Sequence, residues 1–147
     1  MMELVYSAYV ITKKELYFLA GAMGIRQLYG VLDGGTPDDA ELYVIMKNLI
    51  RKGFITTDSD SFVIDGELRE HIKIMAESDK PMLIYDPNGS IPPKCVYSIG
   101  DTTVICEACH ASENDLRLYK VKTDEVQRLI SSGAYIVKEG ERFDDTN

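Results

Sequence analysis

The first part of the chain carries apolar residues at the spacing of helices. The sequence TKKE at residues 12–15 has the form of a capping box. The apolar positions after it recur every three or four residues: Leu16, Leu19, Ala20 and Met23. Gly24 can end this helix, and a second, shorter helix is expected over Ile25 to Leu32.

The clearest helical signal covers residues 37–52. Thr36 is expected to cap this helix, Pro37 to occupy its first position and Gly53 to end it. Two aspartates follow the proline, at the positive end of the helix dipole. The apolar spacing predicts one buried stripe made of Leu42, Ile45, Met46, Leu49 and Ile50.

A β-hairpin and a further helix are expected next. The strands of the hairpin are predicted at residues 54–56 and 62–64, with a polar turn at residues 58–61 between them. The helix is predicted to begin after Asp65 and to end before Asp79. Three helices followed by a hairpin is the order of a winged helix.

After residue 80 the pattern changes to short apolar runs separated by turn residues. These runs are MLIYD, CVYSI, TTVICEAC and LRLYKV. Turns that contain Asn-Gly or Gly-Asp are typical of antiparallel hairpins, so we expect a meander of about four strands. A last amphipathic helix is expected to start at Thr123 and to be ended by Gly133, and the sequence AYIV can add one more strand.

The elements together predict an α+β fold. Residues 1–80 are expected to form a winged-helix-like region of helices and a hairpin. Residues 81–137 are expected to form an antiparallel meander sheet with a helix packed on it, and residues 138–147 a polar tail.

Charge and composition narrow the classes of function. The 147 residues carry a net charge of −8, which opposes binding to nucleic acid because phosphates are recognised mainly by Lys and Arg. The N-terminus lacks the order of a secretory signal, and no stretch approaches the roughly 20 apolar residues of a membrane helix. We therefore expect a cytoplasmic protein that binds neither nucleic acid nor a membrane.

The sequence CEACH has the spacing of a covalent haem site. Its surroundings favour a strand, in which Cys106 and Cys109 would point to opposite faces. A zinc site made of Cys95, Cys106, Cys109 and His110 is the stronger metal hypothesis, although adjacent Cys and His residues rarely bind one ion. We therefore expect neither a metal nor a cofactor.

No hydrolase, zinc-protease or phosphate-loop motif is present in the sequence, so we expect a protein that is not an enzyme. The winged-helix order suggests a transcriptional regulator as an alternative function. However, the helix at 37–52 would present Asp38, Asp39 and Glu41 to the phosphates. The element is better explained as a scaffold for protein packing.

Tyrosine supplies the candidate binding residues. The chain has nine tyrosines and no tryptophan, and tyrosine is enriched at protein interfaces. Tyr85, Tyr97 and Tyr119 occur in three of the predicted strands, where one face of the sheet could collect some of them. They are the predicted partner-binding residues, with ordinary half-buried strand residues as the alternative interpretation.

The order of elements resembles the EspG-type chaperones of type VII (ESX) secretion. The matching stretches are ELYFLAGAMG, LYVIMKNLIRKGFI, LREHIKIMAESDKPMLIYDPNG, VYSIGDTTVICEA and LRLYKVKTDEVQRLI. The resemblance implies a cytosolic adaptor that binds a helical secretion substrate, without catalysis or metal. EspG-type proteins resemble two related halves, and this chain matches one, so a shortened relative, a homodimer or a fragment of a longer protein all fit.

Overall fold

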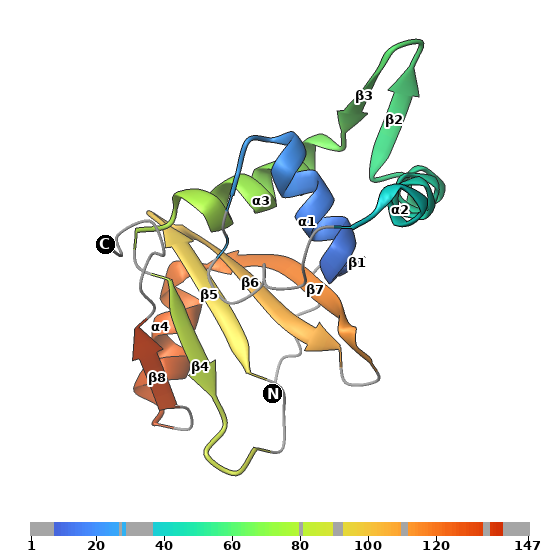
Figure 1. The fold of residues 1–147 in the computed structure, drawn as a ribbon. Coiled ribbons are helices and arrows are strands. Elements are labelled where there is room, and N and C mark those ends of the chain that lie inside the picture. Colours follow the sequence, from blue (N-terminus) through green and yellow to red (C-terminus); the bar gives the residue numbers. More distant parts are fainter. Residues whose placement is uncertain are drawn as a thin grey trace, which may run out of the picture.

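An antiparallel sheet with helices on both faces forms the body of the protein (Figure 1). The structure is a computed structural model that describes residues 8–26, 28, 37–79, 81–89, 93–109, 112–133 and 136–139. In chain order, its elements are β1 (Tyr9–Thr12), α1 (Lys13–Ala22), α2 (Asp39–Lys52), β2 (Ile55–Asp58), β3 (Ser61–Ile64), α3 (Gly66–Glu77), β4 (Met82–Tyr85), β5 (Lys94–Ile99), β6 (Thr102–Cys109), β7 (Ser112–Lys122), α4 (Thr123–Ser131) and β8 (Ile136–Glu139). The predicted α+β class is confirmed.

The main sheet has six strands in the order β1-β7-β6-β5-β4-β8. Its centre is the predicted four-strand meander, β4 to β7, and the predicted extra strand is β8. The other edge strand, β1, comes from the N-terminal region, so the expected division at residue 80 does not separate the sheet from the helices. Because β8 includes Lys138 and Glu139, the tail cannot begin at residue 138, and residues 140–147 lie outside the described residues.

Side-chain caps fix where α1 and α2 begin. The predicted capping box at Thr12 and Glu15 is present at the start of α1. The second capping box, made by Asp38 and Glu41, starts α2 two residues later than predicted, because the carboxylate of Asp38 accepts the N–H of Glu41. The predicted cap Thr36 lies outside the described residues.

The winged-helix order is present only in part. Ile25, Arg26 and Leu28 are not helical, and the rest of the short helix expected over residues 25–32 lies outside the described residues. The hairpin β2–β3 is longer than predicted, since it pairs residues 55–58 with residues 61–64. It projects from the body beside α2 (Figure 1).

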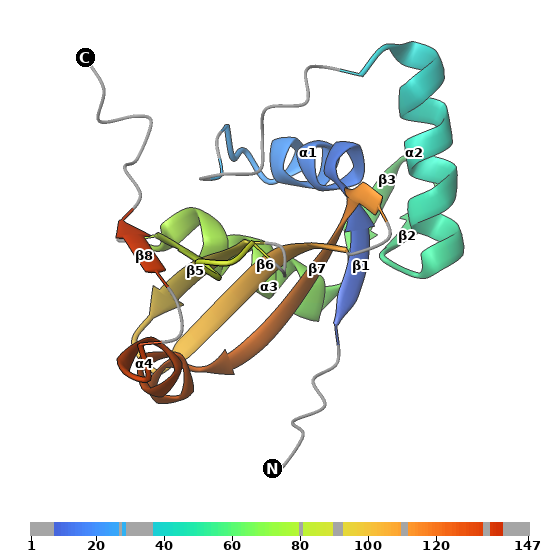
Figure 2. The ribbon, with the colours of Figure 1, turned by 90° about the horizontal axis from the view of Figure 1, so that it is seen from below.

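Different helices cover the two faces of the sheet. Side chains such as Tyr97 and Leu118 pack with α1, α2 and α3 in the larger core, whereas Val96 and Ile105 pack with α4 in a smaller core. This division follows from the alternation of side chains along each strand. Figure 2 shows α1 and α4 on opposite sides of the sheet.

An ion pair between a buried carboxylate and a partly exposed lysine joins α1, α2 and the edge strand β1. Glu15 is 1% exposed, and its Oε1 accepts the N–H of Thr12 at 2.9 Å and the ammonium of Lys52 at 2.7 Å. The same ammonium donates to the carbonyl of Val10 at 3.5 Å. These two backbone groups lie on one edge of β1 because they are two residues apart, so the ion pair covers the edge that β7 does not pair.

We expect Lys52→Met to lower the free energy of unfolding by about 3 kcal/mol, because it leaves a buried carboxylate without its cation. Lys14→Met is the matched control. It breaks the exposed Lys14–Glu41 ion pair and should cost less than about 1 kcal/mol. Urea unfolding of both variants measures the difference, and equal losses would contradict the role given to Glu15.

Candidate protein-binding surface

The predicted tyrosines do not form one surface. Tyr97 is fully buried, which corrects its prediction as a partner-binding residue, and Tyr85 and Tyr119 are half-buried. Tyr97 is paired with Val104 and Tyr119 with Ile105, so the two rings lie on opposite faces of the sheet. The hydroxyl of Tyr119 donates to Glu107 on the neighbouring strand β6, and its ring packs against the smaller core. Tyr119 is therefore part of the sheet's own packing.

The cysteines form no metal site within the described residues. Cys95 and Cys106 face each other across β5 and β6 in the larger core, while Cys109 lies beyond a register shift and outside that core. His110 lies outside the described residues, and the residues that are described hold no group of three His, Cys, Asp or Glu side chains suited to a metal. Burial raises the pKa of both core thiols, that of Cys106 far above its usual range.

A half-buried polar cluster links β1 to α3. The hydroxyl of Tyr9 donates to Asp65 at 2.7 Å, and this hydrogen bond lowers the pKa of Asp65, while burial above all raises the pKa of Tyr9 to about 12. The Nδ1 of His71 lies 2.6 Å from the carbonyl of Glu67 and must carry the proton, because a carbonyl can only accept. Burial lowers the pKa of His71. We assign this cluster a structural role.

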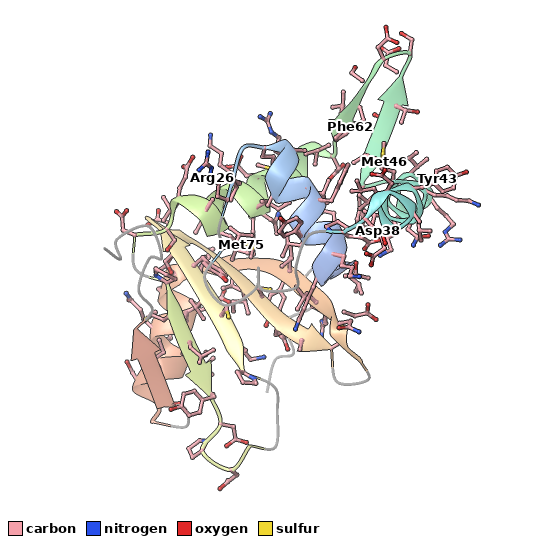
Figure 3. All side chains as sticks on the ribbon, in the orientation of Figure 1. Arg26, Asp38, Tyr43, Met46, Phe62 and Met75 are labelled. Atoms are coloured by element: carbon pink, nitrogen blue, oxygen red, sulfur yellow. The ribbon has the colours of Figure 1, made fainter. Side chains whose placement is uncertain are left out.

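The outer side of α2 is the largest apolar feature exposed on any one element of the described residues. Its side chains Tyr43, Val44 and Ile50 are exposed by 70%, 53% and 46%. This corrects the predicted buried stripe: Ile45 and Leu49 are buried as expected, but Ile50 is exposed, and Leu42 and Met46 are half-buried. The physical reason is that, among the described elements, only one side of α2 packs against others, as Figure 3 shows for the outward-pointing Tyr43.

Three of these residues form a line along the helix. Tyr43, Met46 and Ile50 are spaced by three and four residues, which places them on one side of α2. We call this set the α2 stripe. The helix is acidic in its first turn, at Asp39 and Glu41, and basic in its last turn, at Arg51 and Lys52. The α2 stripe is therefore an apolar line between ends of opposite charge.

Two cavities lie near polar side chains. One, of about 540 Å³, lies between α1, α2 and β7, and another, of about 580 Å³, lies beside α4. At the second cavity, hydroxyl groups form a chain from Ser98 through Thr103 to Thr123, which donates to the carbonyl of Gly100. No His or Cys is among the described residues that line either cavity.

Comparison with known proteins adds no assignment. No protein-family model matches the chain, and no curated protein matches it. In the described part of the chain, none of the helices has the length and apolar character needed to cross a membrane.

We expect the stability of the protein to fall as the pH drops below about 6.5, the ordinary pKa of histidine. The reason is that the pKa of His71 is lower in the folded state, so the unfolded chain takes up the proton first. His71→Gln should remove this loss of stability in the range between pH 6.5 and the pKa that His71 has in the folded protein. Chemical unfolding at a series of pH values measures the effect, and an unchanged profile in the variant would refute it.

Iodoacetamide should modify Cys109 in the folded protein before Cys95 and Cys106. The two core thiols are buried and their pKa values are raised, so little reactive thiolate is present or accessible. Mass spectrometry of the folded and unfolded protein measures the order. Early modification of Cys106 under folding conditions would contradict the described core.

Proposed function

We propose that the protein is a non-catalytic adaptor that binds a helical segment of another protein on the α2 stripe. The exposure of Tyr43 and Ile50 on one side of a regular helix carries this proposal. Contiguous apolar surface of this kind marks interaction sites, and tyrosine is enriched in the buried centre of interfaces.

The geometry of α2 supports a helix as the partner. Apolar residues spaced by three and four positions fit the side chains of a second amphipathic helix. The charges favour an antiparallel arrangement, because the partner's negative first turn would then lie beside Arg51 and its positive last turn beside Asp39.

The proposal includes a cytoplasmic role as a chaperone-like protein of type VII secretion, with a helical secreted protein as the partner. The resemblance of the element order to EspG-type chaperones supports this role. So does the acidic charge of the chain, −8, which disfavours nucleic acid. A partner that buries the α2 stripe would keep its own apolar face out of water until release.

A winged-helix transcriptional regulator is the alternative function. One observation favours it: α2 is exposed on its outer side and is followed by a projecting hairpin. The charges oppose it, since Asp38 and Asp39 begin the helix and Asp58 and Asp60 lie at the hairpin turn. Such a surface would repel phosphates.

Purification from the source cells with tagged variants tests the proposal. The wild type and the control Lys73→Glu, which changes an exposed residue of α3, should recover the same protein with an amphipathic helix, and Tyr43→Glu should lose it. A synthetic peptide of that helix should bind Tyr43→Glu about 30-fold more weakly, a loss typical of an interface hot spot. Isothermal titration calorimetry measures this ratio.

Three outcomes would overturn the proposal. The first is equal binding of the peptide by Tyr43→Glu and the wild type. The second is recovery of DNA, which would support the regulator. The third is light scattering that shows a wild-type dimer and a monomeric Tyr43→Glu variant, because a second copy of the chain would then occupy the α2 stripe.

A further inference from the structure

The outer edge of β3 offers unpaired backbone groups. Among the described strands, β3 pairs only with β2. The N–H of Asp65, the residue that follows β3, points toward β2, because it donates to the carbonyl of Phe54 at 2.8 Å. Backbone groups alternate in direction along an antiparallel pair, so the N–H and C=O groups of Phe62 and Ile64 point away from β2. Exposed strand edges of this kind are templates for pairing with another chain.

A cavity runs beside this edge. It has a volume of about 510 Å³ and is lined by β3 and by Met23 at the end of α1. The two faces of β3 differ: Phe62 stacks on Phe18 of α1, with ring centroids 5.7 Å apart, whereas Val63 lies on the opposite face and is 61% exposed. Because the hairpin projects from the body, a further strand can approach the edge (Figure 1).

The charges differ between the two ends of the cavity. Asp60 lines it at the exposed hairpin turn, where Asp58 also lies, and Arg69 lines it at the base, where α3 begins. None of the ion pairs among the described residues involves these three side chains. Near the base, Asp65 and Glu67 are already bonded to a tyrosine and a lysine. The turn therefore attracts a basic side chain, and Arg69 attracts an acidic one.

These charges argue against a second copy of the chain as the occupant. Two β3 strands related by a two-fold axis can pair both outward residues of each strand only with Val63 opposite Val63 of the copy. That register places Asp60 of one copy opposite Gly66 of the other, beside its Asp65. The carboxylates would repel each other, in addition to the repulsion between two chains of net charge −8.

We propose that the outer edge of β3 binds an extended segment of a partner protein as a third, antiparallel strand. The backbone of the segment pairs with Phe62 and Ile64, as in other proteins that bind peptides by strand addition. The two side chains opposite these residues lie on the α1 side of the strand, beside Met23, and are apolar. A basic residue follows them at the position opposite Asp60, and an acidic residue precedes them on the side of Arg69. This edge lies outside the α2 stripe, and the inference does not depend on the adaptor function.

Hydrogen exchange with a synthetic peptide, acetyl-EVTVTK-amide, tests the edge. In the proposed register its first valine lies opposite Ile64, its second valine opposite Phe62 and its lysine opposite Asp60. NMR should show that the amides of Phe62 and Ile64 exchange quickly in the free protein and slowly when the peptide is at saturation. The amide of Val63 points toward β2 and should exchange slowly in both states.

N-methylated peptides test the register. A methyl group on the nitrogen of the second valine removes the hydrogen bond to the carbonyl of Phe62, and it should weaken binding about tenfold. The matched control carries the methyl group on the threonine between the two valines, whose N–H points away from β3, and should bind like the parent peptide. An NMR titration measures both affinities.

A charge reversal tests the direction of the added strand. Asp60→Lys should bind acetyl-EVTVTK-amide more weakly and regain affinity for acetyl-EVTVTE-amide, whereas the control Glu77→Lys, at an exposed position of α3, should keep the wild-type preference. Tyr43→Glu should bind the peptide like the wild type, which separates this site from the α2 stripe. Absence of saturable protection at Phe62 and Ile64, equal losses from both N-methylated peptides, or protection that appears without peptide as the protein concentration rises would overturn the proposal.

Discussion

The buried carboxylate of Glu15 determines how the N-terminal helices meet the sheet. It binds the amide of Thr12 where α1 begins and the ammonium of Lys52 where α2 ends, and Lys52 also reaches the backbone of Val10. A charge removed from water is tolerated only when such partners are in place, so α1, α2 and β1 are held in one arrangement. The same contacts cover the free edge of β1 and so hinder the addition of another strand there.

The position of α2 follows from this link. Lys52 anchors the end of the helix, and Ile45 and Leu49 turn its inner side toward the larger core. The outer side has no layer above it among the described residues, which leaves Tyr43 and Ile50 in contact with water. The α2 stripe therefore depends on this ion pair, because it lies on the open side of the helix that Lys52 anchors.

Local sequence signals predicted much of the fold because local interactions form those elements. Residues close together in the chain form three of the predicted features: the capping box at Thr12, the meander of β4 to β7 and the helix that starts at Thr123. Long-range contacts decided the rest. The pairing of β1 with β7 joins distant segments, and the burial of Glu15 depends on a lysine 37 positions away, so neither could be predicted from the local pattern.

The same contrast between local and long-range contacts applies to the α2 stripe and to the carboxylate of Glu15. The run of apolar residues 42–46 turns through about 400° on a helix, so its side chains point in every direction and one packed side cannot bury them all. The sequence therefore implies an exposed apolar surface on α2, although the abundance of tyrosine favours the strands as the binding surface. The free oxygen of Glu15 carries no such signal, because a capping box predicts that both ends of the motif are satisfied. Its Oε2 loses contact with water, and is left without a hydrogen bond, only in the folded structure.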